Sequence, residues 1–154
     1  MVQKIDVTIA KLRLLLADMS AKERQYTAVR QQFRDQLRRA VDYSVYGDSS
    51  LDGTLSLMGE IQQRIMDAEA TLRDLELVRT RAERELESLQ LTKRIEGAKT
   101  ELRKLLDQQA ELDRAEPSEG GSEILRQELG EQIRQLREQI NEASEQAART
   151  LGRR

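Results

Sequence analysis

Neither cysteine nor histidine occurs in the 154-residue sequence. Without thiols there can be no disulfide bonds and no cysteine-based zinc sites. Without imidazole there can be no Ser-His-Asp triad and no histidine-containing di-iron motif, and the usual proton shuttle near neutral pH is missing. These two absences remove the side chains that proteins use most often for catalysis and metal binding.

Bulky apolar side chains are scarce. Aromatic residues make up 3% of the chain, with no tryptophan and a single phenylalanine, Phe33. That is too little material for a thick globular core. The 35% of charged residues and the abundance of Ala, Glu, Leu, Arg and Gln are typical of long helices and coiled coils. Regularly spaced Leu and Ile residues argue against a disordered chain.

Long hydrophobic runs are missing as well. No stretch approaches the roughly 18 uncharged apolar residues expected of a membrane-spanning helix. Asp6, Lys11 and Arg13 interrupt the apolar positions among the first 20 residues, which argues against a signal peptide. Together with the lack of cysteine, this predicts a cytoplasmic protein.

Two long segments carry apolar residues spaced alternately three and four apart, the heptad pattern of coiled coils. In a helix predicted over residues 3–46, the apolar seam contains Ile5, Ile9, Leu12, Leu16, Met19, Tyr26, Phe33, Leu37 and Ala40. In a helix predicted over residues 54–113, it contains Met58, Ile61, Ile65, Ala68, Leu72, Leu75, Ala82, Leu86 and Leu89. Polar side chains occupy three seam positions: Glu23, Arg30 and Arg79.

The seam of the second segment changes side near residue 90. The positions that would continue its phase are polar: Lys93, Glu96, Thr100 and Arg103. The apolar residues form a new series instead: Leu91, Ile95, Ala98, Leu102, Leu105 and Leu112. We therefore expect this helix to exchange the first helix for another neighbour, a third helix predicted over residues 123–151. The seam of the third helix contains Leu129, Ile133, Leu136, Ile140, Ala143 and Ala147.

Two turns connect the three segments. Residues 47–53 hold glycines, serines and aspartates; we expect Gly47 to end the first helix in a left-handed conformation, and Asp52 or Thr54 to cap the second. The linker over residues 114–122 holds the only proline and a glycine pair, and its Ser122 is the expected cap of the third helix.

The predicted fold is all-α and forms a single elongated domain. An antiparallel coiled-coil hairpin has a turn near residue 50, so residue i faces about residue 100 minus i. A third, shorter helix packs on the far half of the second helix. Where the helices overlap, we expect the Leu-rich residues 12–16 to be covered on more than one side. Gly97 beside this zone either allows close helix approach, the favoured interpretation, or is a weak point of the helix costing roughly 1 kcal/mol relative to alanine.

Apolar and tyrosine side chains gather at the hairpin tip, within residues 43–58: Tyr43, Val45, Tyr46, Leu51, Leu55, Leu57 and Met58. One interpretation is that they plug the open end of the hairpin. The other is that they dock a protein partner. Asp48 and Asp52 at the same tip superficially resemble the paired carboxylates of transcript-cleavage factors, whose coiled-coil tips enter RNA polymerase; that resemblance implies a stalk that inserts into another machine.

The start of the chain combines Lys4, Lys11 and Arg13 with a broad apolar face, a pattern typical of helices at a membrane surface. Residues 1–46 carry a net charge of +4 and residues 47–113 a net charge of −5. A basic first helix hairpinned to an acidic second one is similar in layout to phage-shock and ESCRT-III-like membrane coat proteins. The overlap with the third helix already needs this apolar face, so a membrane surface is the less favoured alternative.

Arg30, Arg34 and Arg38 form a basic ridge. A phosphate-binding track is one interpretation, but the lack of interleaved aromatic residues and a pI near 5.5 argue against nucleic acid. The hairpin register instead predicts ion pairs with acidic residues of the second helix: Glu60, Asp67 and Glu69, with Glu76 near Arg24.

A second apolar stripe lies off the seam of the second helix and predicts self-association into a homodimer or higher oligomer: Met66, Ala70, Leu77 and Val78. No glycine-rich phosphate loop is present, and no carboxylate pair can be placed in a cleft, so we expect neither an enzyme nor a cofactor or metal site. The sequence predicts a structural or adaptor protein that self-associates and docks protein partners.

Overall fold

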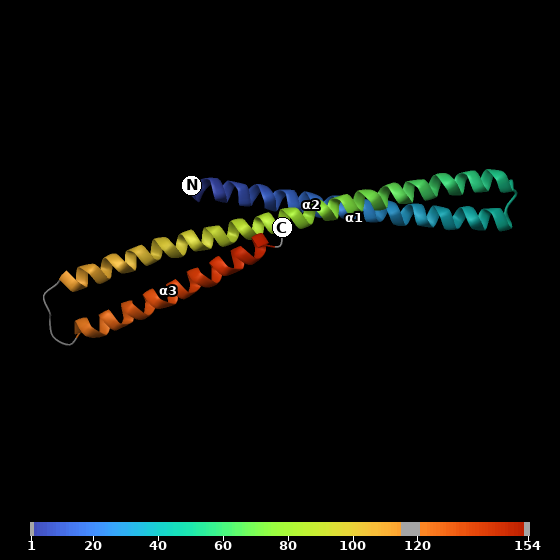
Figure 1. The fold of residues 1–154 in the computed structure, drawn as a ribbon. Helices are drawn as coiled ribbons and strands as arrows, with labels where there is room; N and C mark the ends of the chain where they lie inside the picture. Colours follow the sequence, from blue (N-terminus) through green and yellow to red (C-terminus); the bar gives the residue numbers. More distant parts are fainter. Residues whose placement is uncertain (1, 115–120, 153–154) are drawn as a thin grey trace. The chain divides into compact units, whose positions relative to one another are not determined.

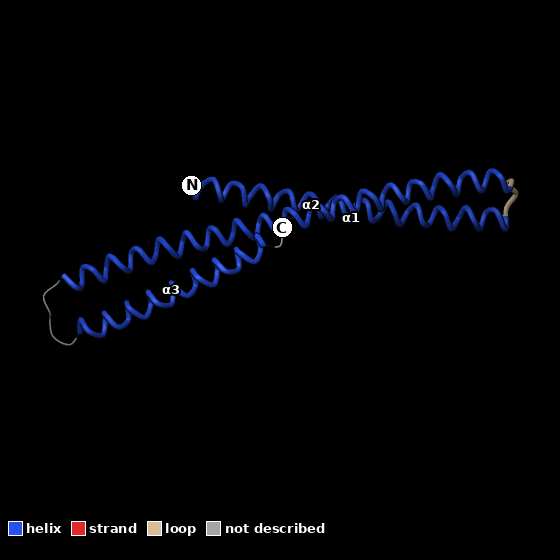
Figure 2. The backbone as a smooth tube through the Cα atoms, in the orientation of Figure 1, coloured by secondary structure: helices blue, strands red, loops and turns tan. Residues whose placement is uncertain are grey.

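The computed structural model describes residues 2–114 and 121–152 of the chain, and within them it contains three helices and no strand (Figures 1 and 2). Helix α1 spans Val2–Tyr46, α2 spans Leu51–Arg114 and α3 spans Gly121–Gly152. Helices α1 and α2 pack against each other as a hairpin, and α3 packs against α2. The predicted all-α hairpin with a third helix is confirmed.

The predicted seams are the faces that the structure buries. Every predicted seam residue of the first helix is buried or half-buried, including the polar Glu23 and Arg30. The buried residues of α2 include Ile61, Ala68 and Ala82, all on the predicted seam. Since no helix here has more than one or two neighbours, burial follows a narrow stripe along each helix.

The phase change in α2 is also confirmed. Leu91 is 6% exposed, and the rest of the new apolar series is half-buried. The four polar residues that would have continued the old phase are all exposed. The burial of α2 therefore moves to another side of one continuous helix.

Helix α3 follows its predicted stripe closely. Ile133 and Ala143 are buried, and the other four stripe residues are half-buried. Arg126 and Thr150 extend the same spacing at either end. The helix begins at Gly121, one residue before the expected cap Ser122, and residues 115–120 of the predicted linker lie outside the described residues.

The described residues fall into two compact units, one over Ala10–Glu83 and one combining Met1–Ile9 with Arg84–Arg154. That the chain forms one domain stays a prediction. In the first unit, Arg34 pairs with Glu69 at 3.1 Å and Arg79 pairs with Glu23 at 2.6 Å. Both pairs obey the predicted register, in which the two residue numbers add to about 100.

The second unit shows the predicted exchange of neighbours. Asp6 of α1 accepts a hydrogen bond from Lys93 of α2, as the hairpin register requires. At the other end of the unit, Arg126 of α3 donates to the carbonyl oxygen of Leu112 at 3.2 Å. Two grooves lined by residues of both α2 and α3 show that these helices lie side by side along α2 as far as Arg84. Within this unit α2 therefore contacts α1 at Lys93 and α3 between Arg84 and Leu112.

Two expectations about the overlap are wrong. Leu14 is 68% exposed and Leu15 is 41% exposed, so the Leu-rich cluster is not covered on several sides. A Cβ atom added at Gly97 would meet no atom within 4 Å, so this glycine does not mediate a close helix approach. Leu14 and Leu15 lie outside the seam on which the helices meet.

Candidate functional site

The hairpin tip is built by a short turn whose hydrogen bonds fix the start of α2. The hydroxyl of Ser50 accepts a bond from the Gly53 backbone N–H at 3.2 Å, the geometry of an N-cap. The Thr54 hydroxyl donates to the Ser50 carbonyl at 3.1 Å and lies 3.1 Å from the Ser49 hydroxyl. The expected caps Asp52 and Thr54 are therefore wrong: the helix starts at Leu51, three residues earlier than predicted, because Ser50 caps it.

Gly47 follows the last residue of α1, and glycine is favoured there for a steric reason rather than a conformational one. Its backbone is not left-handed, contrary to the sequence prediction. Its N–H donates to the Tyr43 carbonyl at 2.9 Å, which continues the helical pattern by one residue. A Cβ atom at this position would lie 2.5 Å from the same carbonyl oxygen, so only glycine fits without a shift of the backbone.

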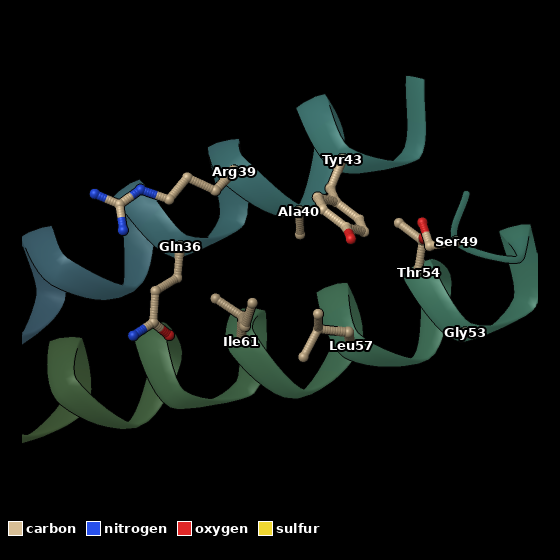
Figure 3. A pocket seen from close by; sticks show the side chains of 9 residues that line it. All are labelled: Gln36, Arg39, Ala40, Tyr43, Ser49, Gly53, Thr54, Leu57 and Ile61. Atoms are coloured by element: carbon tan, nitrogen blue, oxygen red, sulfur yellow. The ribbon is translucent and has the colours of Figure 1, made fainter. Parts of the chain in front are cut away.

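A groove of about 490 Å³ opens between the two helices beside this turn (Figure 3). Ala40 of α1 and Ile61 of α2 are buried at its base, and the Tyr43 ring and Leu57 line its sides. The polar residues that line it are Gln36, Arg39, Ser49 and Thr54. A mainly apolar groove with few polar groups suits an apolar side chain of a partner.

Six of the seven predicted tip residues are exposed. The exposed fractions are 67% for Tyr43, 68% for Val45, 87% for Tyr46, 67% for Leu51, 56% for Leu55 and 48% for Leu57. Met58, the seventh, is half-buried on the seam. A plug requires burial, and the small Thr54, 6% exposed, is what fills the end of the hairpin. The tip therefore presents apolar surface to its surroundings.

The fold does not bring the aspartates of the tip together with further potential metal ligands. In residues 2–114 and 121–152, no three acidic, cysteine or histidine side chains gather closely enough to hold a metal ion. Asp48 and Asp52 remain a pair on an exposed turn. The stalk-factor interpretation stays a prediction with no added support.

The predicted self-association stripe lies on the surface. Met66 is 60% exposed, Leu77 is 71% and Val78 is 50%, and Ala70 is exposed as well. These residues are on one helix, outside its seam with α1. Their accessibility is what an interface would need, and self-association itself stays a prediction.

The arginine ridge is used for interhelical contact at one position. Arg34 forms the predicted ion pair with Glu69. Asp67 instead accepts from Gln63 at 3.0 Å, and Arg24 donates to the Ser20 carbonyl at 3.4 Å rather than pairing with Glu76. Ionic contact across the hairpin is thus sparser than predicted.

Sequence reasoning missed the strongest polar contact of the hairpin. Arg79 donates two hydrogen bonds to the Glu23 carboxylate, at 2.8 and 2.6 Å, and a third to the Ser20 hydroxyl at 3.1 Å. Both charged side chains are about three-quarters buried. They fill facing seam positions, so the register rule applied to the three polar seam positions would have found this pair.

No described helix is apolar enough over a sufficient length to cross a membrane. Comparisons with protein-family models, curated proteins and solved structures found no match to this chain. The hypotheses about its function therefore depend on the geometry of its helices and surfaces.

Proposed function

We propose that the protein is a non-enzymatic coiled-coil structural or adaptor module that self-associates and docks protein partners through its tip. The observation that carries this proposal is the exposure of Tyr43, Val45, Tyr46, Leu51, Leu55 and Leu57 around an apolar groove. Exposed apolar clusters on soluble chains commonly mark interaction sites, and tyrosine is enriched among residues that dominate binding. The groove lining holds no carboxylate, so it offers no acid–base pair.

The test compares proteins captured from the native host by the wild-type chain and by a Val45→Ser, Tyr46→Ser, Leu51→Ser variant. A matched control carries Ile124→Ser and Leu125→Ser, which remove exposed apolar side chains of α3 away from the tip and outside the predicted self-association stripe. The proposal expects the tip variant alone to lose specific partners at unchanged helicity. Identical capture by all three chains would refute tip docking.

A peripheral membrane role is the second candidate, and one observation favours it. Leu14 and Leu15 are exposed on α1 beside the basic Lys11 and Arg13. Apolar residues next to cations suit the interface of an anionic bilayer. Co-sedimentation with phosphatidylserine vesicles tests this role: a Leu14→Ser, Leu15→Ser variant should lose binding, and no sedimentation of the wild type would exclude it.

A further inference from the structure

The two flanks of the hairpin in Ala10–Glu83 differ in chemistry. In the heptad notation a to g, the seam occupies positions a and d, and Arg34 and Glu69 both occupy position e. Because these two residues form an ion pair, the e residues of the two helices lie on the same flank. Gln36, Tyr43 and Leu57 are all g residues and line one groove, so g residues share the other flank. The g residues, here named the apolar flank, are Leu15, Lys22, Val29, Gln36, Tyr43, Leu57, Arg64, Thr71 and Val78.

The e flank is bridged by charge away from the tip, whereas its e residues at the tip, Val41 and Leu55, are apolar and exposed. The Arg34–Glu69 pair bridges the helices there, and Ser20 contributes to the Arg79–Glu23 contact beside it. Glu76 and Glu83 continue the same flank on α2. Charged e and g positions are what keep a two-helix coiled coil from recruiting further helices.

The apolar flank is open. Only Lys22 and Arg64 are charged among its nine residues. Its apolar members are substantially accessible: Leu15 is 41% exposed, Tyr43 67%, Leu57 48% and Val78 50%, whereas Val29 and Thr71 are half-buried.

Small seam residues make this flank concave. The d positions next to it include Ala40, Thr54, Ala68 and Ala82, all buried. The groove in Figure 3 lies on this flank, where Ala40 and Thr54 leave space between the helices. Small residues at a helix interface let another backbone approach closely, so this concave surface has the shape to accept a further helix.

Apolar residues at a, d and g are typical of helices in bundles, whereas a strict a and d seam is typical of a two-helix coiled coil. The flank runs from Leu15 to Tyr43, about 42 Å at 1.5 Å per residue, and is two helices wide. This gives on the order of 700 Å² per partner, close to the roughly 800 Å² per partner of a standard stable interface. A second hairpin supplies a matching surface of the same size.

We propose that a second copy of this chain covers the apolar flank, with the two hairpins side by side and their tips at the same end. This proposal deepens the self-association part of the proposed function and depends on it. The interface is isologous, so each α1 lies against the α2 of the other copy.

The order of residues along the flank favours this orientation. With tips together, Tyr43 of each copy faces Leu57 of the other, so the two apolar grooves at the tips oppose each other. The layer that sets Lys22 against Val78 then lies at the end away from the tip. With tips at opposite ends and Val29 at the centre, Arg64 would take the place of Lys22 against Val78, and Tyr43 in each groove would face Leu15 instead of the other groove. The matching of the two grooves therefore favours the first orientation.

Sedimentation equilibrium on the full chain tests which face is used. The wild type is expected at twice the 17.7 kDa chain mass in the micromolar range. Val29→Glu with Val78→Glu should weaken self-association by about a hundredfold, because four carboxylates would enter the interface. The matched control is Ala28→Glu with Leu77→Glu, exposed residues next in sequence that point away from the flank.

A monomeric wild type would refute both this inference and the self-association in the proposed function. A dimer that dissociates in the Ala28→Glu, Leu77→Glu variant would refute only this inference, and it would place the interface on the predicted self-association stripe instead, whose residues Met66, Ala70 and Leu77 lie outside the apolar flank. Circular dichroism on each variant shows whether the hairpin has kept its helicity.

Cysteine cross-linking tests the orientation and does not depend on destabilising variants, because the chain has no native cysteine. Single Gln36→Cys and Arg64→Cys chains, with tags of different size, are refolded together and then oxidised. The proposal expects a disulfide between the two different chains. Rapid homotypic cross-linking of a Val29→Cys chain, with none between the mixed chains, would show opposed tips and overturn the proposed orientation.

Discussion

At the scale of single residues, Gly97 has no packing contact that requires a glycine. It lies inside α2, and a side chain there would extend into open space. Since glycine is about 1 kcal/mol less favourable than alanine within a helix, we expect Gly97→Ala to stabilise the chain by up to about 1 kcal/mol. Thermal unfolding followed by circular dichroism should show a melting temperature higher by a few degrees.

Gly47→Ala serves as the control for Gly97→Ala, since the same change should have the opposite effect there. The added Cβ atom would lie 2.5 Å from the Tyr43 carbonyl oxygen, so the turn must shift to accept it. A stabilising Gly47→Ala or a destabilising Gly97→Ala would contradict the packing described for these two glycines.

The Glu23–Arg79 pair should matter more for register than for net stability. Glu23→Ala leaves a largely buried guanidinium with the Ser20 hydroxyl as its remaining partner, which should cost about 1–3 kcal/mol in urea unfolding. Replacing both residues with leucine should recover that loss, because apolar pairs often match buried ion pairs in stability. A double variant less stable than Glu23→Ala would show that the pair is a net stabiliser.

At the scale of elements, the phase change in α2 predicts that substitutions at two neighbouring positions, Leu91 and Lys93, differ strongly in their effect on stability. Leu91 is 6% exposed, so Leu91→Ala should lower the free energy of unfolding by about 2–5 kcal/mol. Lys93 continues the old phase but is exposed, and its ion pair with Asp6 is a surface pair. Lys93→Ala should therefore change stability by about 1 kcal/mol or less, as measured by urea unfolding at constant salt.

The elements were largely predictable from the sequence because spacing alone determines which side of a helix can be buried. Heptad spacing identified the seam residues of all three helices, and the break after Leu89 identified the change of neighbour. The ends of the elements were less predictable. The sequence favoured Asp52 or Thr54 as the cap of α2, whereas the hydroxyl that accepts from the Gly53 N–H is that of Ser50, and the choice depends on the backbone path of the turn.

The tip residues could be found from sequence as an unusual apolar cluster, but their exposure could not. Whether Tyr43 and Leu51 fold over the end of the hairpin depends on how tightly the turn closes. The structure closes it with Thr54, a side chain small enough to be buried between Ser49 and Ser50. The large apolar residues are left outside for that reason.

At the scale of the whole molecule, function and stability should separate at the tip. Val45, Tyr46 and Leu51 are each at least two-thirds exposed, so their triple replacement with serine should change the free energy of unfolding by about 0.5 kcal/mol or less. Ile61 lies at the base of the groove beside them and is 5% exposed, so Ile61→Ala should cost about 2–5 kcal/mol. Urea unfolding at high dilution, where self-association is weakest, measures both. A large loss of stability in the triple variant would mean that these side chains plug the hairpin after all, whereas the expected result leaves contact with another molecule as the role that their apolar surface can serve.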